Sequence, residues 1–214
     1  SIIALNVVVF ALWRVPALAG YNGFMTRHFT HLPSSSRAYT LLTSAFSHES
    51  LVHIGVNMYA LAGFLPALQI KGFGSTEQTL AFYVAAAVVA SLGSHLVSAL
   101  WLSRLGMLKP SLGASGAIWA VLISYSIISP DSRIGIVFLP GTDFAMSDLV
   151  PALVCLDIAG LVMRWQMFDH AAHLAGAAFG YWYLTYGRDL WVRGQLWLDE
   201  KKIEEDRTRR RGQW

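Results

Sequence analysis

The stretch GASGAIWAVLISYSII, residues 113–128, is an apolar run without a single charged side chain. It is close in length to a helix that crosses most of a bilayer. Lipid offers no partners for backbone N–H and C=O groups, so such a run is expected to be helical. Ser115 stands near its beginning, among small residues. The stretch therefore predicts an all-α membrane protein with a polar group near one end of a spanning helix.

Five further apolar runs accompany it along the chain, at about residues 2–18, 51–70, 80–102, 149–163 and 171–186. Hydrophobic residues make up 55% of the 214 residues and charged residues 14%. A soluble domain is usually about one quarter charged, so the composition excludes an ordinary soluble protein. We predict one bundle of six transmembrane helices over residues 1–187.

Residues 188–214 differ from the rest, because they hold eight Lys or Arg and six Asp or Glu. We expect this charged tail to be partly helical, to lie outside the bilayer and to contact anionic headgroups. The acids balance most of the bases, so no nucleic-acid partner is expected. Cys155 is the one cysteine, which excludes an intrachain disulfide; we interpret it as a small buried residue.

Four polar side chains share one side of the predicted bundle. The second, fourth and sixth helices all enter the bilayer from the same side. His53 and Asn57 lie one to two turns below that surface, Ser115 lies near the start of its helix, and His173 lies in the first turn of its own. Polar groups are costly inside a bilayer and are functional candidates there. His53 and Asn57 are four residues apart, so they share one helix face. The topology thus predicts a shallow polar cluster drawn from three helices.

Small residues border both Ser115 and His173, and they permit two membrane helices to approach closely. They are Gly113, Gly116, Gly176 and Gly180. Close packing would bring Ser115 within reach of His173, which could take the hydroxyl proton and activate a nucleophile. The oxyanion that results needs donors. His53, Asn57 and the backbone N–H of Ser115, near a helix start, could supply them.

Other interpretations of these residues remain open on spacing alone. A serine in a membrane helix is often a packing residue, and His53 with Asn57 could form a polar clamp between helices. Asp169, His170 and His173 could hold a metal ion, but no H-E-x-x-H motif and no carboxylate partner from another helix is evident, so neither metal nor cofactor is expected. A small transporter would place its polar groups near the midplane.

The remaining ionisable groups are interpreted as structural. Asp157, deep in the fifth run, is expected to be a buried acid that is either protonated or paired with a neighbour. His95 and Glu49 are read in the same way. Arg14 is expected to extend its charge to the bilayer surface.

Three motifs resemble those of the rhomboid intramembrane serine proteases, peptidase family S54. GASG (113–116) resembles their G-x-S-G motif, AHLAG (172–176) their A-H-x-x-G motif and HIGVN (53–57) their H-x-x-x-N motif. The chain looks most similar to the mitochondrial, presenilin-associated branch around residues 111–118, 168–174 and 136–140. That branch carries an extra helix before the six-helix core, so a missing N-terminal segment is expected.

The resemblance implies a serine endopeptidase that cleaves single-pass membrane proteins within or near their transmembrane segments. It implies a Ser115–His173 dyad without a catalytic aspartate, an oxyanion hole lined by His53 and Asn57, and Trp119 packing on the histidine. It also implies the mitochondrial inner membrane. Trp13-Arg14 ends the first run here, whereas many bacterial relatives carry a Trp-Arg pair in a long first loop. The alternative is an inactive relative that binds membrane segments and steers their trafficking or degradation.

Overall fold

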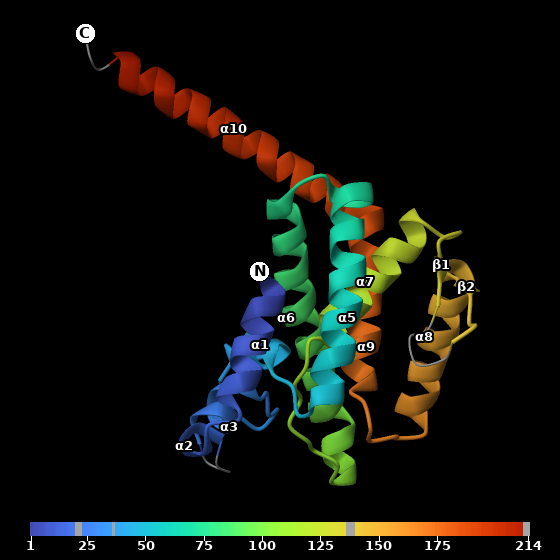
Figure 1. The fold of residues 1–214 in the computed structure, drawn as a ribbon. Coiled ribbons are helices and arrows are strands. Elements are labelled where there is room, and N and C mark those ends of the chain that lie inside the picture. Colours follow the sequence, from blue (N-terminus) through green and yellow to red (C-terminus); the bar gives the residue numbers. More distant parts are fainter. Residues whose placement is uncertain (20–22, 36, 136–139, 212–214) are drawn as a thin grey trace. The chain divides into compact units, whose positions relative to one another are not determined.

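The computed structural model describes residues 1–19, 23–35, 37–135 and 140–211, so most of the 136–140 motif lies outside the described residues. Contacts divide the chain into two compact units, Ser1–Tyr181 and Trp182–Trp214. The chain is mainly helical, as expected, and the described part adds one two-stranded hairpin (Figure 1). The boundary predicted after residue 187 and the placement of the tail outside the bilayer stay predictions.

Each predicted run contains a helix. In chain order these are α1 (Ile2–Leu12), α5 (Leu51–Leu68), α6 (Thr76–Leu100), α7 (Ser115–Ile128), α8 (Met146–Val162) and α9 (His170–Trp182). A π-helical turn, η2 (Gln69–Phe73), continues α5. A second, η4 (Tyr183–Gly187), lies between α9 and α10 (Arg188–Arg211), the helix of the charged tail.

Among the described residues, two helices are long and apolar enough to cross a membrane, at Leu51–Phe73 and Thr76–Leu100. The other four are shorter. At about 1.5 Å per residue, α7 measures about 21 Å, against a hydrocarbon core of about 30 Å. The first helix ends at Leu12 and not near residue 18. A turn at Trp13-Arg14 follows it, and Pro16 then begins a separate helix, α2 (Pro16–Ala19).

The centre of the first unit is built by α5, α6 and α7, which lie side by side (Figure 1). Large buried side chains fill the space between them, among them Leu61, Tyr83 and Val121. Small residues bring the helices close. A Cβ on Gly93 of α6 would overlap the Ala175 side chain of α9, so bare backbone there lets α9 lie against α6. Glycines allow a similar close approach between α7 and α9.

The loop between α1 and α5 contains short helices that hydropathy did not indicate: α3 (Phe24–Phe29), α4 (Thr40–Thr43) and the 3-10 turn η1 (Ser44–Phe46). His31 holds this loop in place. Its ring bonds Thr40 and His95 at 2.8 and 2.9 Å, and its backbone pairs with that of Ser111. Burial, with His95 nearby, lowers the pKa of His31. The loop is thereby tied to the segment that leads into α7.

The end of α1 is tied to the segment that leads into α5. Trp13 donates its indole N–H to Ser47 at 3.2 Å, and Arg14 donates to the Glu49 carbonyl at 3.4 Å. The Arg14 guanidinium also lies 4.3 Å from the centre of the Phe10 ring. The Trp-Arg pair therefore contacts the residues that immediately precede α5.

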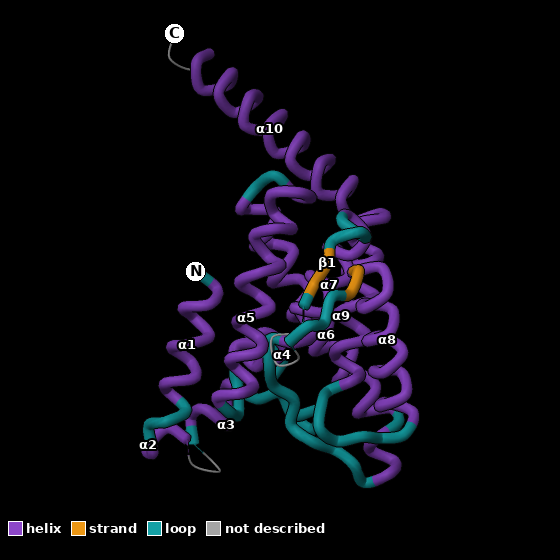
Figure 2. The backbone as a smooth tube through the Cα atoms, turned by 45° about the vertical axis from the view of Figure 1, so that its right-hand side comes forward, coloured by secondary structure: helices purple, strands orange, loops and turns teal. Residues whose placement is uncertain are grey.

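A further 3-10 turn, η3 (Leu102–Leu105), follows α6, and the hairpin of β1 (Arg133–Ile134) and β2 (Phe144–Ala145) precedes α8 (Figure 2). The buried residues of α8 are Met146, Val150, Asp157 and Gly160. Cys155 does not belong to this stripe and is exposed, so its interpretation as a buried residue is wrong. Its position on the helix turns it away from the stripe that packs inward.

Candidate active site

Ser115 and His173, which are 58 residues apart in sequence, meet in the structure. Ser115 is the first residue of α7, and His173 lies in the first turn of α9. The Ser115 Oγ and His173 Nε2 atoms are 2.9 Å apart, within hydrogen-bonding distance. His173 is buried, and the Trp119 ring packs on it with the ring centres 5.7 Å apart. This is the geometry in which an imidazole can take a proton from a hydroxyl.

The close approach of α7 and α9 depends on glycine. A Cβ on Gly176 would overlap the backbone oxygen of Gly116, and one on Gly180 would overlap that of Ala120. A Cβ on Gly116 would lie 2.5 Å from the Ala90 Cβ of α6. The two helices therefore touch through bare backbone at successive turns. Because Ser115 and His173 are the neighbours of these contacts, the glycines set the distance between them.

His53 reaches the same place from α5. Gly113 has a φ of +126°, a conformation that favours glycine. A Cβ there would lie 3.0 Å from His53 Nε2 and 3.8 Å from Ser115 Oγ. The imidazole of His53 and the hydroxyl of Ser115 thus both lie next to the position that a side chain would take at residue 113. A substrate carbonyl bound to Ser115 would lie in that neighbourhood.

Asn57 lies one turn further along α5, on the face that carries His53. Its side chain is buried, and its Nδ2 has no hydrogen-bond partner among the described residues. An unpaired buried donor costs about 1–3 kcal/mol, so such groups call for an explanation. A free N–H donor on the face of α5 that carries His53 is the kind of group that an oxyanion site requires.

His48 is a neighbour of the site that the sequence did not single out. It lies just before α5, and its ring packs edge-on against that of His53, with the centres 4.9 Å apart. Burial, with His53 nearby, lowers the pKa of His48 to about 4. His48 is therefore neutral near pH 7 and supports the His53 ring without adding charge. The signal available in the sequence was only its position five residues before His53.

Asp157 of α8 contacts the other ring nitrogen of His173. Its carboxylate oxygens lie 3.0 and 3.2 Å from His173 Nδ1, and Oδ1 lies 2.5 Å from His170 Nδ1. The expectation of an acid paired with a neighbour is thus the one that fits. The expectation that no carboxylate from another helix reaches these histidines is wrong, because α8 turns Asp157 inward.

Within the part of the chain that the structure describes, Asp157, His170 and His173 are also the group that could hold a metal ion, since their ligand atoms lie within 4.8 Å of one another. An ion there would bond His173 through Nδ1 and leave Nε2 facing Ser115. The contacts between the three residues already have hydrogen-bond lengths.

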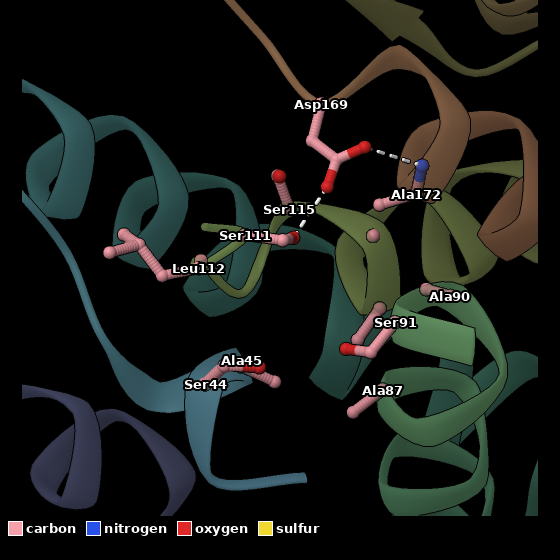
Figure 3. Close-up of a pocket in the computed structure, with 13 residues that line it drawn as sticks. Ser44, Ala45, Ala87, Ala90, Ser91, Ser111, Leu112, Ser115, Asp169 and Ala172 are labelled. Carbon is pink, nitrogen blue, oxygen red and sulfur yellow. Dashed lines mark hydrogen bonds between the residues drawn. The ribbon is translucent and has the colours of Figure 1, made fainter. Parts of the chain in front are cut away.

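Asp169 makes contacts that differ from those of Asp157. Its Oδ2 accepts hydrogen bonds from Ser94 and Ser111, at 2.6 and 2.5 Å. Its Oδ1 accepts from the backbone N–H of Ala172, and Figure 3 shows this bond and the one from Ser111. Asp169 therefore caps α9 and joins that helix to α6 and to the segment that leads into α7. A pocket of about 10 Å³ lies beside Ser115, with Ser91, Ser111 and Asp169 among its walls, room for about one water molecule.

Comparison with known proteins shows the family to which the chain is similar. The rhomboid domain matches residues 35–189. The zebrafish (Danio rerio) presenilin-associated rhomboid-like protein A, mitochondrial, is 45% identical over 191 residues, which cover 89% of this chain and 48% of that protein. The human presenilin-associated rhomboid-like protein, mitochondrial, is 44% identical with the same coverage.

A more distant relative matches the whole chain. Rhomboid protein 1, mitochondrial, of Saccharomyces cerevisiae is 33% identical over 221 residues, which cover 100% of this chain and 57% of that protein. The chain thus spans about half the length of the curated relatives that it matches. Since the matched domain includes α5 to α9 and every residue of the candidate site, the chain belongs to the rhomboid family.

Proposed function

We propose that this chain is an intramembrane serine endopeptidase that cleaves single-pass membrane proteins within or near their transmembrane segments. The observation that carries the proposal is the 2.9 Å contact between Ser115 Oγ and His173 Nε2, made at the first turns of two helices in an apolar bundle. Membership of the rhomboid family supports it independently.

The reaction follows from the two atoms in contact. As Ser115 Oγ bonds to the substrate carbonyl carbon, its proton passes to His173 Nε2. Collapse of the tetrahedral intermediate breaks the C–N bond, and the same proton goes to the departing amine. Water then attacks the acyl-enzyme while His173 takes its proton, and the proton returns to Ser115 when the acid product leaves. His173 therefore acts first as a base and then as an acid in each half of the reaction.

The negative charge on the substrate oxygen requires donors that are already in place. We assign this role to His53, to the unpaired Nδ2 of Asn57 and to the backbone N–H of Ser115. The last of these belongs to the first residue of α7, where N–H groups have no partner within the helix and the helix dipole is positive. Trp119 packs on His173 and limits the movement of its ring.

The surface of the helices supports a membrane setting. Large apolar side chains are exposed on α5, α6 and α8, among them Leu51, Tyr59, Leu92 and Val162. Lipid or the membrane segment of a substrate would cover them. We extend this to a bundle of six membrane helices, in which the shorter ones are completed by flanking loops. Because the relatives named above are mitochondrial by name, we place the chain in the mitochondrial inner membrane.

The proposal is tested with the purified chain in liposomes and a reporter that carries one transmembrane segment. We expect cleavage within or near that segment, mapped by mass spectrometry, and covalent labelling of Ser115 by a fluorophosphonate probe. The inactive-relative alternative expects neither product nor label. The contact of nucleophile and base favours the enzyme, since an inactive relative has no need of both groups in hydrogen-bonding distance.

Replacing Asn57 by alanine is expected to lower kcat by about 100-fold to 1,000-fold with KM little changed, because one oxyanion donor is lost. The measurement is steady-state cleavage of the reporter in liposomes. Thermal stability should not fall, since the Asn57 amide donor has no partner to lose.

Asn6 provides the matched control for this substitution. It is also a fully buried asparagine in a membrane helix, but its Nδ2 donates to the Ile2 carbonyl at 2.9 Å. Asn6→Ala should lower stability and leave kcat within a few-fold of the parent. Equal losses of kcat in the two variants would show that Asn57 does not belong to the oxyanion site.

A further inference from the structure

We propose that His31 and His95 are positioning residues for Ser115, and that their hydrogen bond makes cleavage sensitive to acid at a second place besides His173. The bond fixes the loop between α1 and α5, and this loop holds residues 111–113, the segment that leads into the nucleophile. The inference rests on the proposed function and adds a support to its site. Neither histidine belongs to the three sequence motifs.

The first step is the contact between the loop and the segment 111–113. His31 and Ser111 exchange two backbone hydrogen bonds, at 2.9 and 2.8 Å, and the Gly113 N–H donates to the Ser44 carbonyl at 3.0 Å. Gly113 lies two residues before Ser115, and both line the same small pocket. A shift of the loop would therefore be passed on to the first residue of α7.

The second step is what holds the loop itself. The His31 side chain is buried, and its Nδ1 lies 2.8 Å from the Thr40 hydroxyl while its Nε2 lies 2.9 Å from Nδ1 of His95. Thr40 begins α4, and Ser44 begins η1 directly after that helix. One imidazole thus connects both backbone contacts of the loop to α6, which carries His95.

The third step is the direction of these hydrogen bonds. The Thr40 hydroxyl donates its one proton to the Arg37 carbonyl at 2.6 Å, because a carbonyl oxygen can only accept. Thr40 therefore accepts from His31, which places the His31 proton on Nδ1. Nε2 of the neutral His31 ring is then an acceptor, and His95 donates to it from Nδ1. The bonds run one way, from His95 through His31 and Thr40 to Arg37.

The fourth step is what added protons do to this row. One proton on Nε2 of His95 leaves the contact intact, since the Nδ1–H of that ring still donates to His31. When both rings are charged, an N–H of His31 faces an N–H of His95, and neither atom can accept. Two like charges in contact also repel. The bond between the rings is therefore lost on the second protonation, and the loop is released from α6.

The pH at which this happens follows from the surroundings of His31. Burial, the larger cause, and the neighbouring His95 of α6 lower the pKa of His31 from its ordinary value of 6.5, whereas Asp169, just before α9, raises it. Arg37 of the same loop is exposed. A released His31 binds protons more readily than the held one. The bond therefore contributes its full stability above pH 6.5 and loses it as the pH falls through the lowered pKa.

The first test compares His95→Leu and His95→Asn with the parent, as full chains in liposomes near neutral pH. His95→Leu removes the donor to His31. It should lower kcat by about 10-fold to 100-fold with KM within about threefold, because a shift of about 1 Å between catalytic groups can cost about 100-fold. His95→Asn keeps an N–H donor near the place of Nδ1 and should recover most of that loss. A folded His95→Leu with the kcat of the parent would overturn the proposal.

The pH profile separates this role from plain support of the fold. An amide can turn either its N–H₂ or its oxygen toward His31, so His95→Asn keeps a bond in both charge states of that ring. Between about pH 7.5 and about pH 4.5, kcat of the parent should fall about tenfold further than that of His95→Asn. The fall caused by protonation of His173 is common to both. Profiles of the same shape would contradict the proposal.

Tyr39→Phe is the matched control in the same loop. The Tyr39 hydroxyl is hydrogen-bonded to Nδ1 of His28 at 2.6 Å, an exposed contact between two residues of the loop. Its loss should leave both kcat and the pH profile close to those of the parent. If Tyr39→Phe loses as much kcat as His95→Leu, any loosening of the loop has this effect, and the role assigned to His31 and His95 fails.

The last measurement needs neither catalysis nor a variant. In protein labelled with ¹⁵N-histidine, a hydrogen bond between two imidazoles gives a ¹⁵N–¹⁵N coupling between a protonated Nδ1 and a bare Nε2. We expect this coupling near neutral pH and its loss by about pH 4.5. Its absence at neutral pH, or its persistence in acid, would overturn the proposal even if the His95 variants failed to fold. Failure of the proposed function would look different, since the parent and Ser115→Ala would then cleave the reporter equally or not at all.

Discussion

Ser115→Ala is expected to lower cleavage of a membrane-segment reporter by at least about 10,000-fold, because it removes the atom that bonds to the substrate carbonyl. His173→Asn should lose a similar amount, since Nε2 is the base in contact with that atom. The two losses should not add, because a serine and its base act as one unit. The double variant is therefore expected to match Ser115→Ala in kcat, measured with the purified chains in liposomes.

Ser124→Ala is the matched control on the same helix. Ser124 is fully buried in α7, and its hydroxyl donates to the Gly180 carbonyl at 3.3 Å, well along the helix from the site. Its replacement should cost some stability and leave kcat near that of the parent. If Ser115→Ala cleaves as fast as Ser124→Ala, then Ser115 is not the nucleophile and the proposed function is lost with it.

The placement of the site could be anticipated because it depends on few facts. Apolar runs gave the helices, and their order put Ser115 and His173 near helix starts on one side of the bundle. Glycines at helical spacing indicated which faces could touch, and Gly116 and Gly176 do touch. Hydropathy and spacing determine these features locally, so they can be read without coordinates.

Asp157 shows where the sequence is insufficient. An acid inside an apolar run is expected to be protonated or paired, but the sequence does not identify the partner, because the direction in which α8 faces depends on packing along its whole length. The ends of helices were missed for a related reason. Hydropathy continues from α1 through Trp13 to residue 18, whereas the helix stops at Leu12 because of a turn and a proline. The prediction that Cys155 is buried was wrong for a similar reason. Apolar composition does not distinguish the lipid-facing side of a helix from its inner side.

Gly176→Val is the second variant for which a large effect is expected. A Cβ at this position would overlap the backbone oxygen of Gly116, and backbone cannot move aside as a flexible side chain can. The helices α7 and α9 must then separate at the level of Ser115 and His173. Overpacking of this kind costs about 1–3 kcal/mol, or about 3–10 °C in Tm for a chain of this size.

The loss of activity should exceed what the loss of stability explains. A shift of about 1 Å between catalytic groups can cost about 100-fold in rate, so kcat should fall at least that far at temperatures where Gly176→Val is still folded. Gly63→Val in α5 is the control, because a Cβ there meets nothing within 4 Å. It should change Tm and kcat little. Retention of full kcat by folded Gly176→Val would mean that the distance between Ser115 and His173 is set by other contacts, with Gly113 and Asp169 as the next candidates.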